Sequence, residues 1–371
     1  MNYSTSTNDR ISNGISVVRI LSMFWIVAVN YFSWLFRDLY SVDYAFATAN
    51  SMNFIATMNE NESVLDKISY MLAYSGWLGV VAFATVSGVS LWFSTLKKGT
   101  FKLNDYISSR ICGIYIPYLL SIPIAVLVTY VICGGEVFKS MAISALIMGG
   151  ARFNDAAHVL NTPVWFVSLI ILLYLVYPIF VFMYSKFNIK SVVFVTALLF
   201  VVNWFFAKQL GVFYPLMPFL IVFLVGFLFM HFIYNSPEQN KLFSIIAIPI
   251  CSATLLWMIY FEPQIKGVSM INDYYFAGVV AMVLMFSVGY LLPVKWNKVL
   301  MYMSRGTFAV FLYHYLFIHP VIFAISWIKS LTVSLWLIYG SMLIAGVFMQ
   351  SYVDKKIAQY IKPLFNKEIA C

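Results

Sequence analysis

Ten apolar stretches of about 20 residues divide this chain. A helix of that length and composition can cross the hydrocarbon core of a bilayer. The stretches lie at about residues 15–36, 72–94, 113–133, 163–184, 190–208, 214–234, 242–261, 274–293, 306–328 and 332–352. Only 10% of the residues are charged and 62% are hydrophobic, whereas a soluble domain is about 25% charged. We therefore predict an all-α, polytopic integral membrane protein with about ten transmembrane helices.

The longest polar stretches are about 30 residues, too short for a separate soluble core, so we treat residues 1–371 as one transmembrane domain. Residues 1–14 and 353–371 are predicted to be cytoplasmic tails. The first apolar stretch is about 22 residues long, which favours a retained span over a signal peptide. Two long connections, at about 37–71 and 134–162, either roof a cavity on the outer side or serve as solvated spacers.

The distribution of lysine and arginine predicts the orientation of the chain. With the N-terminus in the cytoplasm, fifteen basic residues fall in inner segments and seven in outer ones, and Arg19 remains inside a span. This excess favours a cytoplasmic N-terminus and, with ten spans, a cytoplasmic C-terminus. The net charge of +9 then forms a basic belt beside anionic membrane lipids. The basic residues do not cluster as nucleic-acid binding requires, so no nucleic-acid partner is predicted.

The four cysteines predict neither a disulfide framework nor a zinc site, because none of them forms a CxxC pair. We expect small buried side chains at these positions. No metal and no permanently bound cofactor is predicted.

Two polar residues share one face of the first apolar stretch. Arg19 and Asn30 are eleven residues apart, about 20° past three full helical turns and about 16 Å along the axis. A charge in hydrocarbon is costly and by default indicates a functional site. Arg19 either binds a ligand phosphate or extends to the inner headgroups. Asn30 either belongs to a site or forms a hydrogen bond between helices.

Arg110, His314 and His319 are further candidates. Arg110 lies where the third span begins, and it either clamps a phosphate through two hydrogen bonds or anchors the span. The two histidines are five residues apart, about 140° around the helix, so they cannot both face one cavity squarely. His314 is the preferred general base, because imidazole titrates near neutral pH. Each histidine also has a purely structural interpretation.

Five short motifs, in the order of the spans, resemble those of the membrane acyltransferase-3 family. They are Arg19 with position 30; the run 80–86 that closes on Ser87-Gly88; Arg110 with Pro117; Trp165-Phe166 with Tyr174 and Pro178; and Ser304, Phe308, Tyr313 and His314.

The resemblance implies a bacterial inner-membrane enzyme that acylates cell-surface sugars. Acetyl-CoA or another acyl-CoA from the cytoplasm would be the co-substrate, and a cell-envelope glycan or lipid-linked sugar the acceptor. Arg19 and Arg110 are predicted to bind the acyl donor, and Asn30 and His314 are predicted to be catalytic. The predicted substrate-binding residues are Ser87, Trp165 and His319.

Two positions depart from the family pattern. The family has histidine at position 30 and a second arginine at position 113, where this chain has Asn30 and Gly113. Asparagine cannot accept a proton; it can only orient a group or donate to a developing oxyanion.

Three hypotheses therefore stay open. The chain is an O-acyltransferase, a catalytically impaired relative that acts in polysaccharide export or binding, or a secondary transporter. The scarcity of acidic residues within the spans argues against ion-coupled transport.

Overall fold

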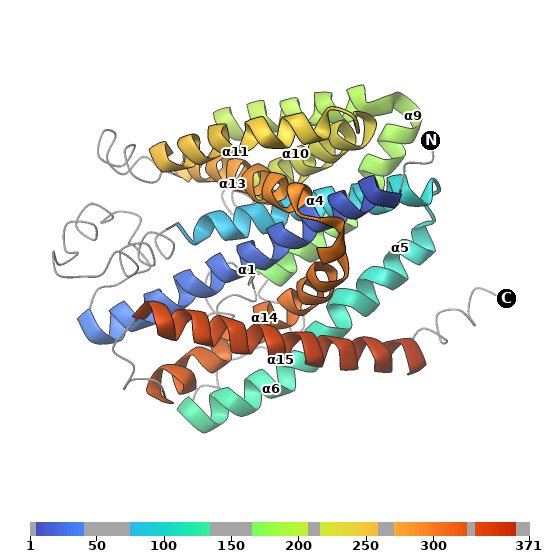
Figure 1. The fold of residues 1–371 in the computed structure, drawn as a ribbon. Coiled ribbons are helices and arrows are strands. Elements are labelled where there is room, and N and C mark those ends of the chain that lie inside the picture. Colours follow the sequence, from blue (N-terminus) through green and yellow to red (C-terminus); the bar gives the residue numbers. More distant parts are fainter. Residues whose placement is uncertain are drawn as a thin grey trace. The chain divides into compact units, whose positions relative to one another are not determined.

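The computed structural model describes residues 5–40, 75–133, 165–206, 216–258, 271–324 and 331–360. Regular structure within these ranges is helical, without strands. The elements are α1 (Thr5–Tyr40), α4 (Trp77–Lys98), α5 (Leu103–Arg110), the π-helix η2 (Ile111–Tyr115), α6 (Ile116–Cys133), α9 (Trp165–Phe206), α10 (Leu216–Asn235), α11 (Asn240–Leu256), α13 (Ile271–Leu291), the 3₁₀-helix η7 (Val294–Trp296), α14 (Asn297–Ala324) and α15 (Leu331–Tyr360) (Figure 1). The predicted all-α fold is confirmed for this part of the chain.

Five helices in the described ranges are long and apolar enough to cross a membrane. They are Ser6–Asn30, Trp77–Lys98, Phe166–Phe205, Leu216–Asn235 and Tyr274–Leu291, and Asn240–Leu256 is apolar but shorter. This supports a multi-pass membrane protein. Each predicted apolar stretch overlaps one of the described helices, and two of the stretches fall on the single element α9.

α9 consists of two helices joined at Asn188. The backbone of this residue has φ 64° and ψ −177°, and asparagine tolerates a positive φ better than most other non-glycine residues. Its side-chain oxygen accepts a hydrogen bond of 2.6 Å from the Ile189 amide. The break falls between the stretches predicted at 163–184 and 190–208.

α1 and α15 continue beyond the apolar stretches that predict them. α1 begins at Thr5, so residues 5–14 of the predicted N-terminal tail are helical. α15 continues to Tyr360, so residues 353–360 of the predicted C-terminal tail are helical as well. Hydropathy marks the apolar part of a helix and not its polar ends.

Three polar side chains, Arg10, Asn13 and Asn297, tie the first turns of α1 to the end of α13 and the start of α14; we call them the polar clasp. Arg10 donates to the Tyr290 carbonyl at 3.4 Å, and Asn13 donates to the Pro293 carbonyl at 3.4 Å. Carbonyls at a helix C-terminus have no partner within the helix. The bond from Arg10 thereby reaches a carbonyl in the last turn of α13, whereas the Pro293 carbonyl beyond that helix also accepts a hydrogen bond from the Trp296 amide.

Asn297 completes the polar clasp with two hydrogen bonds. Its amide nitrogen lies 2.9 Å from the Asp9 carbonyl and 3.1 Å from the Asn13 side-chain oxygen. Asn13 is completely buried and Asn297 is nearly so. Removing one partner of a buried hydrogen bond leaves the other unsatisfied, which costs about 1–3 kcal/mol.

We therefore expect Asn297→Ala to lower the melting temperature of the detergent-solubilised protein, with a loss of about 1–3 kcal/mol of stability. The exposed Asn104 of α5 offers a matched control, and Asn104→Ala should melt close to the unaltered protein. Equal melting temperatures for the two variants would contradict a role for the clasp in stability.

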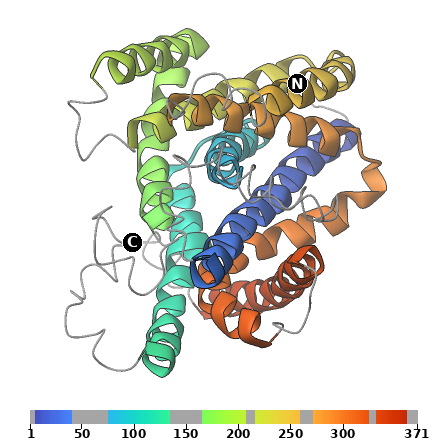
Figure 2. The same ribbon diagram turned by 90° about the vertical axis from the view of Figure 1, so that its left-hand side faces the viewer.

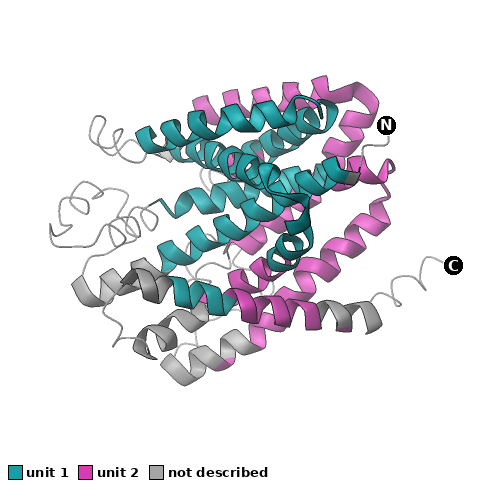
Figure 3. Ribbon diagram, in the orientation of Figure 1, with its two compact units in different colours: residues 1–93, 221–304, 318–342 teal, residues 94–220, 305–317, 343–371 magenta. Residues whose placement is uncertain are grey.

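The chain divides into two compact units (Figure 3). Unit 1 comprises Met1–Phe93, Ile221–Ser304 and Ile318–Met342, and unit 2 comprises Ser94–Leu220, Arg305–Phe317 and Leu343–Cys371. The division passes through α4, α10, α14 and α15.

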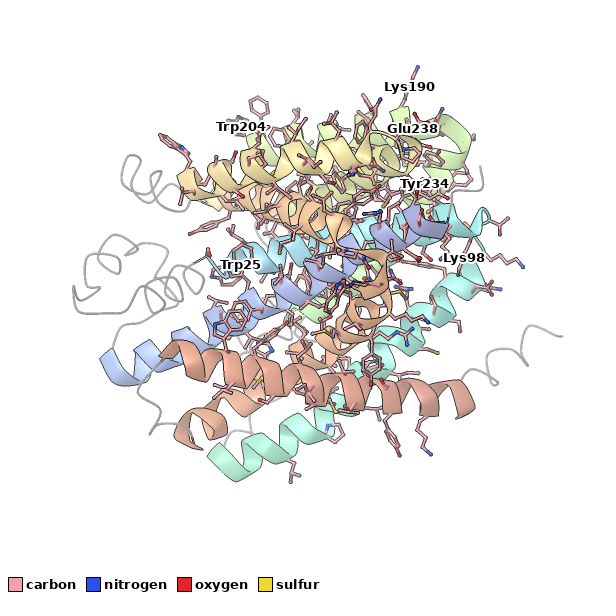
Figure 4. The ribbon with its side chains drawn as sticks, in the orientation of Figure 1. Trp25, Lys98, Lys190, Trp204, Tyr234 and Glu238 are labelled. Atoms are coloured by element: carbon pink, nitrogen blue, oxygen red, sulfur yellow. The ribbon has the colours of Figure 1, made fainter. Side chains whose placement is uncertain are left out.

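Within unit 1, α4 is the most enclosed helix. Fourteen of its 22 residues are buried, and Figure 2 shows it nearly end-on with α1 and α13 beside it. Glycines permit these approaches: an added Cβ at Gly79 would lie 2.6 Å from the Ser22 carbonyl of α1 and 2.8 Å from Cβ of Trp25 (Figure 4). Small residues at helix crossings are typical of membrane proteins.

α4 and α10 cross through a reciprocal pair of glycines. A Cβ at Gly88 would collide with the Phe223 carbonyl, and a Cβ at Gly226 would collide with the Thr85 carbonyl. Beside this crossing the rings of Trp92 and Phe227 stack with centroids 4.0 Å apart. Close backbone approach and ring stacking therefore hold the two helices together.

Candidate functional site

Arg19 and Asn30 lie on one continuous helix, α1, so the predicted shared face is retained. Both side chains are partly exposed, whereas Met23 and Ile26, on the same face between them, are 0% and 2% exposed. Two buried apolar side chains therefore lie between the two polar groups. The Asn30 amide nitrogen donates to the Ile26 carbonyl at 2.8 Å. This bond directs the amide nitrogen toward its own helix.

α15 holds the same part of α1 through Tyr339. The Tyr339 hydroxyl donates to the Ile20 carbonyl at 2.5 Å, one residue after Arg19. The Phe24 ring stacks on the Trp336 ring with centroids 4.4 Å apart, and it meets the Tyr339 ring edge-on with centroids 5.1 Å apart. The segment that carries Arg19 is thus fixed by α4 on one side and by α15 on another. Only the fold reveals this partner, because Tyr339 lies 319 residues away in sequence.

Ser87 lies at the α4–α10 crossing and is 3% exposed. Its hydroxyl donates to the Phe83 carbonyl of its own helix at 2.8 Å. The adjacent Gly88 is required by the close approach of α10. The Ser87-Gly88 motif is thereby explained by helix packing, and the role of Ser87 in substrate binding stays a prediction.

Arg110, in unit 2, lies against two tyrosine rings. Its guanidinium carbon is 5.7 Å from the centroid of the Tyr106 ring and 5.5 Å from that of the Tyr174 ring. A cation within about 6 Å of an aromatic centroid is attracted by the ring. Its Nε donates to the Ser109 hydroxyl at 3.3 Å. In the described part of the chain, no carboxylate forms an ion pair with this guanidinium.

The two tyrosines belong to an aromatic cluster of Phe101, Tyr106, Tyr174 and Tyr177. The Tyr106 hydroxyl donates to the Tyr174 carbonyl at 2.7 Å, and the Tyr177 hydroxyl lies 2.7 Å from the Thr95 hydroxyl. The Phe101 ring lies 5.4 Å from Tyr106 and 6.0 Å from Tyr177. Burial raises the pKa of Tyr106, so its hydroxyl stays protonated and remains a donor. The cluster is a rigid support for a cation.

A π-helix, η2, follows Arg110 directly and contains Gly113. Short π-helical segments occur frequently at functional sites. Gly113 is exposed, and among the described residues no atom would lie within 4 Å of an added Cβ. Packing therefore does not require glycine here, in contrast to Gly88.

His314 is completely buried on the part of α14 that belongs to unit 2. Its Nδ1 lies 3.0 Å from the Val310 carbonyl and 2.9 Å from the Phe311 carbonyl. Carbonyl oxygens only accept, so Nδ1 carries the proton. The lone pair of the neutral ring is then on Nε2, the atom through which this histidine could accept a proton.

The remaining predicted residues contribute backbone positions only. Trp165 is the first residue of α9, and His319 lies in α14; both side chains lie outside the described residues. Arg19, Asn30 and Ser87 belong to unit 1, whereas Arg110 and His314 belong to unit 2. In the described ranges, no group of three or more His, Cys, Asp or Glu could hold a metal ion.

Comparison with known proteins identifies one family. A family model described as "Acyltransferase domain" matches residues 12–351. No curated protein matches this chain, and no solved structure does either. The match extends from the first turns of α1 to the last turns of α15.

Proposed function

This chain belongs to the acyltransferase-3 family, and we propose that it transfers an acetyl group from acetyl-CoA to a hydroxyl of a cell-surface polysaccharide or glycan precursor. In this reaction the sugar oxygen bonds to the acyl carbon as the carbon–sulfur bond of the thioester breaks. The hydroxyl proton passes through a base to the departing thiolate, giving the ester and free CoA. We place the protein in the bacterial inner membrane with ten spans and both termini in the cytoplasm.

At the residue level, this proposal depends on the contacts that the Arg110 guanidinium makes. Its guanidinium lies against two tyrosine rings and forms no ion pair with a carboxylate of the described residues. A partly exposed arginine in this state is suited to a planar, bidentate contact with phosphate. Lys97, Lys98 and Lys102 are exposed in the same unit, and Lys98 extends away from its helix in Figure 4. In the proposed orientation these groups face the cytoplasm, where acyl-CoA is found.

The proposed roles of His314 and Asn30 follow from their hydrogen bonds. His314 presents Nε2 as the proton acceptor, because Nδ1 donates to backbone carbonyls. Asn30 would orient the acceptor or stabilise the oxyanion, since an amide cannot act as a base. Arg19 would contact the CoA moiety from the inner side, and Ser87, Trp165 and His319 would contribute to the sugar site.

Asn30 also supports a second candidate function, that of a catalytically impaired relative in polysaccharide export or binding. The family places histidine at this position, and a missing general base typically costs about 10²- to 10⁴-fold in rate. The bond from Asn30 to the Ile26 carbonyl shows that the amide also has a structural partner. The two candidates differ in whether the unaltered chain transfers acyl groups.

The test is acylation of surface polysaccharide in a strain that lacks the gene, complemented with the unaltered chain, Arg19→Ala or Asn30→His. The enzyme proposal expects ester formation by the unaltered chain and a loss of at least about tenfold in Arg19→Ala. Membrane levels of each variant serve as the control. Ester formation only in Asn30→His would favour the impaired relative. If neither the unaltered chain nor any variant formed an ester, this would contradict both the transfer reaction and its restoration by histidine at position 30.

A further inference from the structure

We propose that Tyr106 is a positioning residue: it holds the Arg110 guanidinium so that its outer N–H edge faces the phosphate groups of the acyl donor. This inference rests on the proposed function, because it concerns how the donor is recognised. It adds a residue whose importance no motif of the sequence indicates.

The geometry restricts how the guanidinium can present its donors. The guanidinium carbon of Arg110 lies 5.7 Å from the Tyr106 ring centroid and 5.5 Å from the Tyr174 ring centroid. The Nε–H is directed to the Ser109 hydroxyl at 3.3 Å. We assign the N–H groups of the two terminal nitrogens to the ligand. Those groups form the fork that matches two oxygens of a phosphate.

Tyr106 is itself held firmly enough to act as a support. Its hydroxyl donates to the backbone carbonyl of Tyr174 at 2.7 Å, which joins α5 to α9. Its ring also lies 5.4 Å from Tyr177, whose side chain is 0% exposed. A flexible arginine loses conformational freedom when it binds a ligand, and a fixed stacking surface lowers that cost. Tyr106 therefore tunes donor affinity without contacting the reacting atoms.

A simple anchoring role for Arg110 makes a different prediction. If the arginine only anchors the helix start, a change at Tyr106 affects stability and leaves phosphate recognition untouched. A positioning role instead weakens the phosphate-bearing half of CoA selectively. The two halves of CoA are available as separate probes: adenosine 3′,5′-bisphosphate carries charge, and pantetheine carries none.

The experiment measures binding of CoA, adenosine 3′,5′-bisphosphate and pantetheine to purified full-length protein, and KM and kcat with acetyl-CoA. The variants are Tyr106→Phe, Tyr106→Leu and Arg110→Ala. We expect Tyr106→Leu to weaken binding of CoA and of the bisphosphate by about three- to tenfold, with pantetheine unchanged. KM should rise by a similar factor while kcat is retained. Tyr106→Phe, which keeps the ring, should show a smaller effect.

Tyr177→Phe is the matched control. It removes one hydroxyl and one 2.7 Å hydrogen bond from the same cluster, while the rings of Tyr106 and Tyr174 remain in place under Arg110. It should leave the ratio of bisphosphate to pantetheine affinity unchanged, even if the protein melts at a lower temperature.

The outcomes separate this inference from the proposed function. Weaker CoA binding in Arg110→Ala but not in Tyr106→Leu overturns the positioning role alone. An equal loss for all three probes in Tyr106→Leu also overturns it, because it indicates general structural damage. No binding of CoA to the unaltered protein overturns the proposed function together with this inference.

Discussion

Gly88→Ala is expected to destabilise the protein by about 3 kcal/mol or more, although it adds a single methyl group. The new Cβ would overlap the Phe223 carbonyl oxygen and lie 3.0 Å from its carbonyl carbon. These are backbone atoms of α10, so no side chain can rotate away. Separating the helices would also loosen the Trp92–Phe227 stack. The measurement is the melting temperature in detergent and the yield of monodisperse protein by size-exclusion chromatography.

Gly340→Ala is the control for that prediction. Gly340 lies within α15, and an added Cβ there has no atom of the described residues within 4 Å. Alanine is favoured over glycine in a helix interior by about 0.5–1 kcal/mol, so this variant should melt at or slightly above the temperature of the unaltered protein. If Gly88→Ala and Gly340→Ala melted together, the crossing of α4 and α10 would not be as close as described.

His314→Asn should abolish acyl transfer almost as completely as His314→Ala, with a loss of about 10²- to 10⁴-fold. Asparagine keeps an N–H donor near the position of Nδ1, as Asn30 does when it donates to the carbonyl four residues earlier. The bonds to Val310 and Phe311 can therefore be replaced in part, whereas the lone pair of Nε2 is lost. The measurement is ester formation from acetyl-CoA, normalised to the amount of folded protein.

The pair of His314 variants separates chemistry from packing. A purely structural histidine predicts that asparagine recovers much of the activity that alanine loses, in parallel with the melting temperature. If His314→Asn transferred acyl groups at the unaltered rate, the base would have to be another group. Arg305→Gln, on the same helix at an exposed position, should leave the rate within about twofold, as expected of a surface substitution.

Hydropathy predicts the apolar parts of the helices in the described ranges, of which five are long and apolar enough to cross a membrane, but it does not predict where the helices end. α14 begins at Asn297, before the apolar stretch predicted at 306–328, because its first turn is secured by the polar clasp. In α1, Arg10 and Asn13 of the polar clasp likewise lie before the apolar stretch predicted at 15–36. Such ends depend on partners nearly 300 residues away, which no local window can detect.

The sequence predicts which residue types belong to the candidate site, but it does not predict which residues contact them. The position of Arg110 just before the third apolar stretch indicates an anion contact, but nothing in the sequence pairs it with Tyr174, 64 residues later, although Tyr174 belongs to one of the family-like motifs. In the structure Arg110 is the last residue of α5. In the Ser87-Gly88 motif the sequence predicts a substrate-binding role for the serine, whereas the structure shows a clear packing role for the glycine. Motif spacing reports residues along one helix; helix crossings determine which of them meet.

The polar clasp has a consequence for biogenesis. Arg10 and Asn13 find their acceptors only after residues 290 and 293 have been synthesised, and Asn13 is fully enclosed in the finished fold. In the proposed orientation both residues lie on the cytoplasmic side of the first span, so water has to solvate the Arg10 guanidinium and the Asn13 amide until α13 has been made. A nascent chain that stalls before α13 emerges would display these unsatisfied groups, a signal by which membrane proteases could distinguish it from the completed protein.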